Sequence, residues 1–198
     1  MMDAIRWFDF AFSIVALIIL FPFFVLLALF IKLSSKGPVF FRQSRVGKGG
    51  KEFELYKFRS MYVNAHEKGL LTVGGKDNRI TAIGFYLRKY KLDELPQLVN
   101  VLKGEMSMVG PRPEVKKYVD LYTEAQRRVL EVRPGITDNA SIVFRNENDL
   151  LATAADPEEF YINVVMPKKI ELNYEFINNR SIQQYFKIII KTIRTSLR

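Results

Sequence analysis

The feature that most constrains this chain is an uncharged apolar run from Phe10 to Ile31, FAFSIVALIILFPFFVLLALFI, which only Ser13 and Pro22 interrupt. As one continuous helix the run would extend about 33 Å, enough for the roughly 30 Å hydrocarbon core of a bilayer. The residues before it, MMDAIRWFD, do not form the basic segment of a signal peptide, and no small-residue cleavage pattern follows it. We therefore expect a membrane helix that stays in the mature protein.

Pro22 lies in the middle of this run. A proline inside a helix removes one backbone hydrogen bond, and its ring clashes with the preceding turn, so the helix should bend there. Two membrane arrangements fit the pattern: a kinked helix that spans the bilayer, and a re-entrant helix that returns to the face from which it entered. The apolar pattern by itself fits both.

The charge of the chain indicates an anionic partner. The sequence holds 30 Lys and Arg against 21 Asp and Glu, a formal net charge of +9, which suits nucleic acid, acidic lipid or a phosphorylated substrate. Because cytoplasmic segments next to membrane helices are rich in Lys and Arg, the globular part is expected in the cytoplasm. The basic residues that carry this prediction are Lys32, Lys36, Arg42, Arg45, Lys48 and Lys51. With no cysteine in the chain, disulfides and thiolate metal sites are excluded.

The remaining patterns predict an α+β, mainly helical protein of two parts, a membrane-embedded helix over residues 1–36 and one cytoplasmic domain over residues 37–198. Strand-like runs flank the glycines at 47, 49 and 50, which predicts a small β-hairpin. The last expected helix is basic and amphipathic, which suits either the membrane interface or packing on the domain. The expected strands cover residues 39–45 and 52–58, and the expected helices cover residues 81–90, 94–102, 114–132, 157–178 and 181–197.

The stretch RKYKLDELPQLVNVLKGEMSMVGPRP, residues 88–113, carries the clearest chemistry. Asp93 and Glu94 are adjacent carboxylates at a predicted helix start, where exposed N–H groups favour the ionised form, with Asp93 as the N-cap. They could act as a nucleophile and metal ligands, or simply cap the helix. Arg88 and Arg112 lie close in sequence, so cations and carboxylates could meet at a phosphorylated ligand. Oxygen ligands of this kind favour Mg²⁺, with Mn²⁺ as a substitute.

Three segments in order resemble the bacterial sugar transferase family, also described as monotopic phosphoglycosyl transferases. They are KFRSM at 57–61, LRKYKLDELPQLVNVLKGEMSMVGPRPE at 87–114 and RPGIT at 133–137, and they follow an apolar helix with a central proline. The length resembles the minimal catalytic form of the family. The chain has Phe21 where many members have serine before the proline, and Asp138 where many have glycine.

The resemblance implies a phosphoglycosyl transferase that works in two steps. Asp93 would attack the sugar-linked phosphate of a UDP-sugar, and polyprenyl (undecaprenyl) phosphate would then accept the sugar phosphate from the enzyme. Glu94 would bind Mg²⁺ or help to activate the acceptor. Arg88 and Arg112 are the first candidates for phosphate contacts. The further candidates, which could instead make structural ion pairs, are Lys57, Arg59 and Arg145.

The resemblance also favours the re-entrant arrangement of the helix around Pro22. It places the protein at the bacterial inner membrane, with the catalytic domain on the cytoplasmic face among membrane lipids. The chief competing interpretation is a membrane-tethered lipid-binding or scaffold protein without catalysis, and a second is a nucleotide-sugar pyrophosphatase. Nucleic acid is not an expected partner, because the basic residues are dispersed and lack an array of stacking aromatics. The patterns predict neither the sugar nor the oligomeric state.

Overall fold

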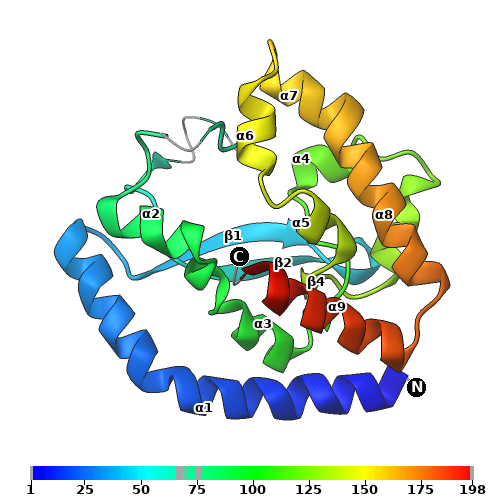
Figure 1. Ribbon diagram of the computed structural model, residues 1–198, viewed down its shortest axis with the longest axis horizontal. Helices are drawn as coiled ribbons and strands as arrows, with labels where there is room; N and C mark the ends of the chain where they lie inside the picture. The colour runs from blue at the N-terminus through cyan, green and yellow to red at the C-terminus, as the bar shows by residue number, and fades with distance from the viewer. Residues whose placement is uncertain (1, 66–68, 70, 75–76, 197–198) are drawn as a thin grey trace.

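The computed structural model describes residues 2–65, 69, 71–74 and 77–196. It is mainly helical with two small two-stranded sheets (Figure 1), which confirms the predicted class. The helices are α1 (Met2–Ser34), α2 (Ala82–Lys89), α3 (Gln97–Lys103), α4 (Lys116–Val119), α5 (Asn139–Val143), α6 (Glu147–Ala152), α7 (Pro157–Phe160), α8 (Met166–Asn178) and α9 (Ile182–Ser196). Short 3₁₀ helices form η1 (Lys48–Gly50), η3 (Leu92–Glu94) and η4 (Gln126–Glu131), and a π-helix forms η5 (Tyr161–Val165). The strands are β1 (Phe40–Val46), β2 (Glu52–Phe58), β3 (Ser107–Val109) and β4 (Gly135–Thr137).

Within the described residues, α1 is the one helix long and apolar enough to cross a membrane. Figure 1 shows it bending partway along its length, as expected from the proline inside it, Pro22. The bend separates an N-terminal arm, residues 2–21, from a C-terminal arm, residues 23–34. Beside the bend, Ile18, Ile19 and Phe21 are 68%, 69% and 65% exposed. This middle part of α1 therefore has an apolar surface that the rest of the chain does not cover.

The N-terminal arm is fastened to the domain by polar contacts. The Arg6 guanidinium donates to the carbonyls of Val101 and Leu102 at the end of α3, at 2.6 and 2.9 Å. A cation at this place complements the negative end of the helix dipole. The buried Asp9 carboxylate accepts from the hydroxyl of Ser107 at 2.7 Å and from that of Tyr185, and so joins α1 to β3 and α9.

The C-terminal arm packs on the same domain through apolar contacts. Leu27 and Ile31 are buried against Phe58 of β2 and Leu87 of α2. Burial of such side chains contributes about 1.5–3 kcal/mol each. Both arms of α1 therefore contact the rest of the chain, while side chains near the bend stay exposed.

The predicted hairpin is confirmed. β1 and β2 pair antiparallel from Phe40 opposite Phe58 to Val46 opposite Glu52. The turn contains Gly49 and Gly50 at φ of +69° and +76°, a region that residues with a Cβ seldom adopt. The buried Asn100 of α3 accepts from the backbone N–H of Tyr56 at 3.0 Å, which attaches α3 to β2.

A second, parallel pair was not predicted. β3 and β4 pair Ser107 with Gly135 and Val109 with Thr137. Beside the pair, Gly110 and Gly135 approach so closely that a Cβ on Gly135 would lie 2.1 Å from the Gly110 nitrogen. Both glycines are required for this contact, which fixes the start of the non-helical segment Pro111–Pro113.

The expected long helix over residues 114–132 is wrong. The chain there forms only α4 and η4, because the Glu114 carbonyl accepts from the Val46 N–H at 2.8 Å and keeps the start of the segment extended. A second interruption comes from Thr123 and Gln126, whose side chains each bond the other's backbone N–H. These local bonds restart the chain in a new turn and override the helical spacing.

The expected helix over residues 94–102 begins later than predicted, at Gln97 with Pro96 before it. Its end is as expected, since Gly104 has a left-handed conformation with φ of +85°. Asp93 is therefore not the N-cap of this helix, and that prediction is wrong. Asp93 and Glu94 lie instead in the preceding turn η3.

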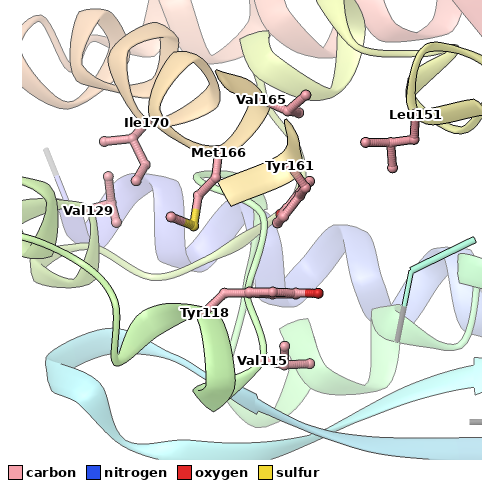
Figure 2. Packing of buried hydrophobic residues seen from close by; sticks show 8 residues of the cluster. All are labelled: Val115, Tyr118, Val129, Leu151, Tyr161, Val165, Met166 and Ile170. Atoms are coloured by element: carbon pink, nitrogen blue, oxygen red, sulfur yellow. The ribbon is translucent and has the colours of Figure 1, made fainter. Parts of the chain in front are cut away.

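The two C-terminal helices are confirmed. α7, η5 and α8 run in succession over the region predicted as 157–178, and α9 occupies the region predicted as 181–197. Between α8 and the α4 segment lies the apolar cluster of Figure 2, in which the rings of Tyr118 and Tyr161 lie 5.0 Å apart. None of the residues of this cluster comes from α1.

Candidate active site

A cavity of about 370 Å³ lies within the domain, and most of the predicted site residues line it. This volume is within the range of small-molecule pockets, roughly 300–1,000 Å³. One end lies near the end of α1, where Pro38 and Phe40 contribute to its wall. Beside this end are four charged side chains, which we call the charged end: Lys57, Arg88, Asp93 and Arg112.

The carboxylate pair is placed by a sharp change of chain direction after α2. Lys91 has a left-handed conformation with φ of +56°, which ends α2 and starts η3. In that tight turn the side chains of Asp93 and Glu94 are both buried. Of the two, Asp93 lines the cavity, whereas Glu94 lies behind it against the cations.

Glu94 is held from two sides. The Lys57 Nζ donates to its Oε1 at 3.1 Å. The Arg112 guanidinium makes a two-pronged ion pair, with Nη1 at 3.0 Å from Oε2 and Nη2 on Oε1. Such fork-shaped pairs are strong and fix the orientation of both partners. Glu94 therefore orders two of the predicted phosphate-binding cations.

Asp93 has a different environment. Its buried Oδ1 accepts no hydrogen bond from the described residues. A buried acceptor without a partner is costly in a folded protein, and such groups concentrate at functional sites. Asp93 is thus a carboxylate that the fold holds beside a cavity without satisfying it.

The two carboxyl groups are driven apart in acidity. Burial raises the pKa of Asp93, and the negative charge of the adjacent Glu94 raises it further. This corrects the expectation that a helix start favours the ionised Asp93. For Glu94, burial also acts to raise the pKa, but Arg112 and Lys57 outweigh it and hold that pKa well below its usual range. Neighbouring groups with separated pKa values are a common property of catalytic pairs.

Arg112 is positioned by Asp138, which the sequence patterns did not identify as a site residue. The Asp138 Oδ2 accepts from the backbone N–H of Arg112 at 2.9 Å and from the Asn173 amide at 3.0 Å. Its Oδ1 caps the start of α5 at Ser141. Asp138 therefore joins the Arg112 loop to α5 and α8. The departure from glycine at this position was the available sequence signal.

Two of the other predicted cations lie at the charged end. Burial lowers the pKa of Lys57, while its partner Glu94 opposes that change. Arg88, in the last turn of α2, donates to the Thr72 hydroxyl at 3.0 Å and lines the cavity. Both are placed where a phosphate group beside Asp93 would meet them.

Arg59 and Arg145 make backbone contacts elsewhere. The Arg59 guanidinium donates to the carbonyls of Ser35 and Lys36 at 2.7 and 2.8 Å and so caps the end of α1. Although Arg59 also lines the cavity, its terminal nitrogens are engaged there. Arg145 donates to the Thr195 carbonyl in α9 and does not line the cavity.

Beyond the charged end, the cavity continues into a part that we call the inner chamber, whose walls come from α4, α6, η5 and α8. It is lined by Tyr118, Glu147, Leu151, Tyr161, Met166 and Lys169. At its boundary Arg45 pairs with Glu114 at 2.9 Å, and Glu114 also accepts from the Tyr161 hydroxyl. Sequence analysis did not identify these residues, because the contacts join segments far apart in the chain.

The described residues contain no group of three or more His, Cys, Asp or Glu side chains able to hold a metal ion. Asp93 nonetheless offers an oxygen without a protein partner. Magnesium commonly binds through one or two carboxylates together with substrate phosphates. The residues therefore fit a Mg²⁺ ion that a diphosphate substrate would help to hold, mainly through Asp93, since both Glu94 oxygens are engaged by cations.

A sequence model of the family described as bacterial sugar transferase matches residues 2–198. Over 197 residues the chain is 40% identical to UDP-N-acetylgalactosamine-undecaprenyl-phosphate N-acetylgalactosaminephosphotransferase of Aeromonas hydrophila, which covers 97% of this chain and 43% of that protein. Over 185 residues it is 39% identical to UDP-glucose:undecaprenyl-phosphate glucose-1-phosphate transferase of Xanthomonas campestris pv. campestris, covering 91% of this chain and 36% of that protein. An uncharacterized sugar transferase of Bacillus subtilis (strain 168), EpsL, is 42% identical over 167 residues, covering 84% of this chain and 74% of that protein. The chain thus spans less than half the length of the first two relatives.

Proposed function

The chain belongs to the bacterial sugar transferase family, and on that premise we propose that it transfers a sugar 1-phosphate from a UDP-sugar to undecaprenyl phosphate or a similar polyprenyl phosphate. The names of two relatives support the choice of donor and acceptor. The observation that carries the proposal is the pairing of the unsatisfied Asp93 with the fully engaged Glu94. One carboxylate is available for chemistry, and the other holds the cations that the chemistry needs.

In the first step, an Asp93 carboxylate oxygen attacks the sugar-linked phosphorus of the UDP-sugar. An oxygen–phosphorus bond forms to Asp93, and the bond from that phosphorus to the bridging oxygen breaks. UMP leaves with the electron pair. The product on the protein is an aspartyl phosphosugar.

In the second step, an oxygen of the polyprenyl phosphate attacks the same phosphorus. The bond to Asp93 breaks, the carboxylate is regenerated, and the sugar becomes linked to the lipid through a diphosphate. Because one phosphorus–oxygen bond replaces another in each step, no oxidant or reductant is required.

The cations of the charged end would act on the phosphate groups. Arg88 and Arg112 present guanidinium groups that can bind phosphate oxygens, and Lys57 supplies a buried ammonium beside them. These charges would oppose the repulsion between the Asp93 carboxylate and an anionic diphosphate. Fixed charges of this kind also stabilise the transition state without reorganising.

We further propose that Asp93, together with the substrate phosphates, would hold Mg²⁺, or Mn²⁺ in its place. When bound, the ion would neutralise phosphate charge as a Lewis acid. Glu94 would contribute mainly by orienting Lys57 and Arg112, since both of its oxygens are already engaged.

The contacts of α1 support the re-entrant arrangement. Arg6 and Asp9 fasten the N-terminal arm, and Leu27 and Ile31 fasten the C-terminal arm, to one domain. A helix with both ends on one domain would leave the membrane on the side where that domain lies. By the excess of basic residues after α1, this is the cytoplasmic face of the inner membrane.

This arrangement can be tested with a membrane-impermeant thiol reagent, because the chain has no cysteine of its own. A cysteine added before Met1 should stay unlabelled in intact spheroplasts and react after the membrane is opened. A cysteine at Lys116, on the exposed surface of α4, is the cytoplasmic reference. Labelling of the N-terminal cysteine in intact cells would mean that α1 spans the bilayer.

The proposed activity is tested by supplying the purified protein with a panel of UDP-sugars, undecaprenyl phosphate and Mg²⁺. We expect UMP release and a lipid-linked diphosphosugar with at least one donor. Sugar phosphate released into water despite the lipid acceptor would indicate a pyrophosphatase instead. Lipid binding without UMP release from any donor would indicate a tethering or scaffold protein.

A further inference from the structure

The inner chamber is a part of the cavity that the proposed chemistry does not use. It lies beyond Arg45 and Glu114, and its lining residues come from α4, α6, η5 and α8. Figure 2 shows part of this lining, with Tyr118 on one side and Tyr161 and Met166 on the other. In Figure 1, α4, α6 and the start of α8 next to α7 lie on the side of the molecule away from the bend of α1. The cavity therefore has one end near the membrane helix and another end away from it.

The walls of the chamber combine aromatic surface with one ion pair. Tyr118 and Tyr161 provide ring faces, and Met166 and Leu151 extend the apolar wall. Within this wall Lys169 Nζ lies 2.9 Å from Glu147 Oε2, and the two side chains are 15% and 24% exposed. An apolar and aromatic pocket with a few convergent polar groups is typical of small-molecule sites.

The Glu147 carboxylate of this ion pair acts electrostatically on Arg112 of the charged end. Glu94 raises the pKa of Arg112 most strongly, and the Glu147 carboxylate adds to the same effect. Arg112, Glu147 and Lys169 line the same cavity, so a ligand with its phosphate groups at Arg112 could extend toward the Glu147–Lys169 pair.

The geometry of phosphoryl transfer limits which portion that is. The attacking and leaving oxygens lie roughly in line on opposite sides of phosphorus. In the first step UMP departs opposite Asp93, and in the second step the lipid phosphate arrives opposite Asp93. The nucleotide and the lipid thus use the same side of the phosphorus in turn, whereas the sugar extends in another direction throughout.

The lipid phosphate has to reach that shared side from the membrane, and hence from the end of the cavity near α1. The opposite end is left for the group that remains in place during both steps. We propose that the inner chamber binds the pyranose ring of the donor and that Glu147 and Lys169 select the sugar through its hydroxyl or acetamido groups. This inference rests on the proposed function.

The chemistry of the pair suits this role. A carboxylate accepts hydrogen bonds from sugar hydroxyls, and an ammonium donates to hydroxyl or acetyl oxygens. A site built on such bonds discriminates against a sugar that lacks the matching group, because its own buried groups then lose a partner.

The experiment compares Glu147→Gln and Lys169→Met with two control variants, Lys168→Met and Glu171→Gln. The control pair makes a 2.7 Å ion pair on the same helix, but its side chains are 54% and 68% exposed and lie outside the cavity wall. For each protein, kcat/KM is measured with UDP-sugars that differ at one hydroxyl or acetamido group. Inhibition by UMP and the KM for undecaprenyl phosphate are measured alongside.

We expect kcat/KM for the preferred donor to fall about tenfold or more in the chamber variants, because a charged hydrogen bond is lost. The ratio of kcat/KM between paired sugars should become smaller. Inhibition by UMP should stay within about twofold of that of the unaltered protein, which also indicates an intact fold. The controls should match the unaltered protein.

Three results would overturn the inference. If the chamber variants match the controls with every sugar, the chamber does not bind the sugar. If UMP inhibition weakens in step with all donors, the chamber binds the nucleotide instead. If the unaltered protein releases no UMP from any donor, the proposed function itself fails, a result that is distinct because it does not depend on the variants.

Discussion

The charged end and the inner chamber are two parts of one cavity with different charge balance. At the charged end, Glu94 is shared by two cations, and Arg88 adds a third near the unsatisfied Asp93. Around the inner chamber the ions form one-to-one pairs, Arg45 with Glu114 and Lys169 with Glu147. An excess of cations suits an anionic diphosphate, whereas balanced pairs suit a neutral sugar ring. We infer that chemistry and substrate selection are separated along the cavity.

The largest effect is expected from Asp93→Asn. The amide has the same shape but cannot form the phosphosugar bond, so transfer to undecaprenyl phosphate should fall at least about 1,000-fold. The rate is measured as UMP release with saturating donor and acceptor. Near-normal turnover of the Asp93→Asn protein would mean that the charged end does not supply the nucleophile.

Glu94→Gln should reduce both activity and stability. Loss of the carboxylate leaves Lys57 and Arg112 without their partner, and breaking a buried ion pair typically costs about 3–5 kcal/mol. We expect a roughly 100-fold lower kcat and a clearly lower free energy of unfolding in denaturant titration. Glu158→Gln is the control, because that glutamate pairs with Lys117 on the surface, where the expected change is within about 0.5 kcal/mol. Equal effects of the two variants would contradict the role assigned to Glu94.

Arg88 and Arg145 were both predicted as phosphate contacts, and the structure separates them. Arg88 lines the cavity beside Asp93, whereas Arg145 holds a carbonyl of α9 outside it. We expect Arg88→Met to lower kcat/KM for the donor by about 10- to 100-fold and Arg145→Met to leave it within about twofold. Donor saturation curves measure both. A large loss of activity in Arg145→Met would mean that a cation outside the cavity also acts on the donor.

A smaller effect is expected at the boundary of the inner chamber. Tyr161→Phe removes the hydroxyl that donates to Glu114, but Arg45 still holds that carboxylate. The KM for the donor should rise about threefold while kcat changes little. Tyr174→Phe is the matched control, since its hydroxyl bonds the Ala125 carbonyl and its side chain does not line the cavity. A fall in kcat of Tyr161→Phe without a change in KM would place Tyr161 in the chemistry.

The charged end was largely predictable from sequence because its central residues lie within one short segment. Asp93, Glu94 and Arg112 are close in the chain, and the prolines around Arg112 indicate a fixed loop. The predicted meeting of cations and carboxylates is seen at Glu94, which Arg112 contacts. Lys57, for which a structural ion pair was the alternative, pairs with the same carboxylate. The split in acidity was not predictable, since it depends on which carboxyl group the cations reach.

The inner chamber was not predictable for a physical reason. Tyr161 meets Glu114 and Lys169 meets Glu147 across long stretches of chain, so no local spacing marks them. The helix that was wrongly predicted over residues 114–132 lies in the same region. Apolar residues such as Tyr118 and Val129 have helical spacing there, but they pack from separate turns. Hydrogen bonds between distant segments determine the backbone conformation there, and such bonds cannot be predicted from the spacing of apolar residues.

The identity of the nucleophile is tested by measuring the mass of the protein after incubation with its UDP-sugar in the absence of a lipid acceptor. We predict one added phosphosugar per chain, located at Asp93 by peptide fragmentation, formed with an equal amount of UMP and removed on addition of undecaprenyl phosphate. The Asp93→Asn protein should gain no mass. Lipid-linked product formed without any adduct, or an adduct on a different residue, would contradict the central claim that Asp93 is the nucleophile.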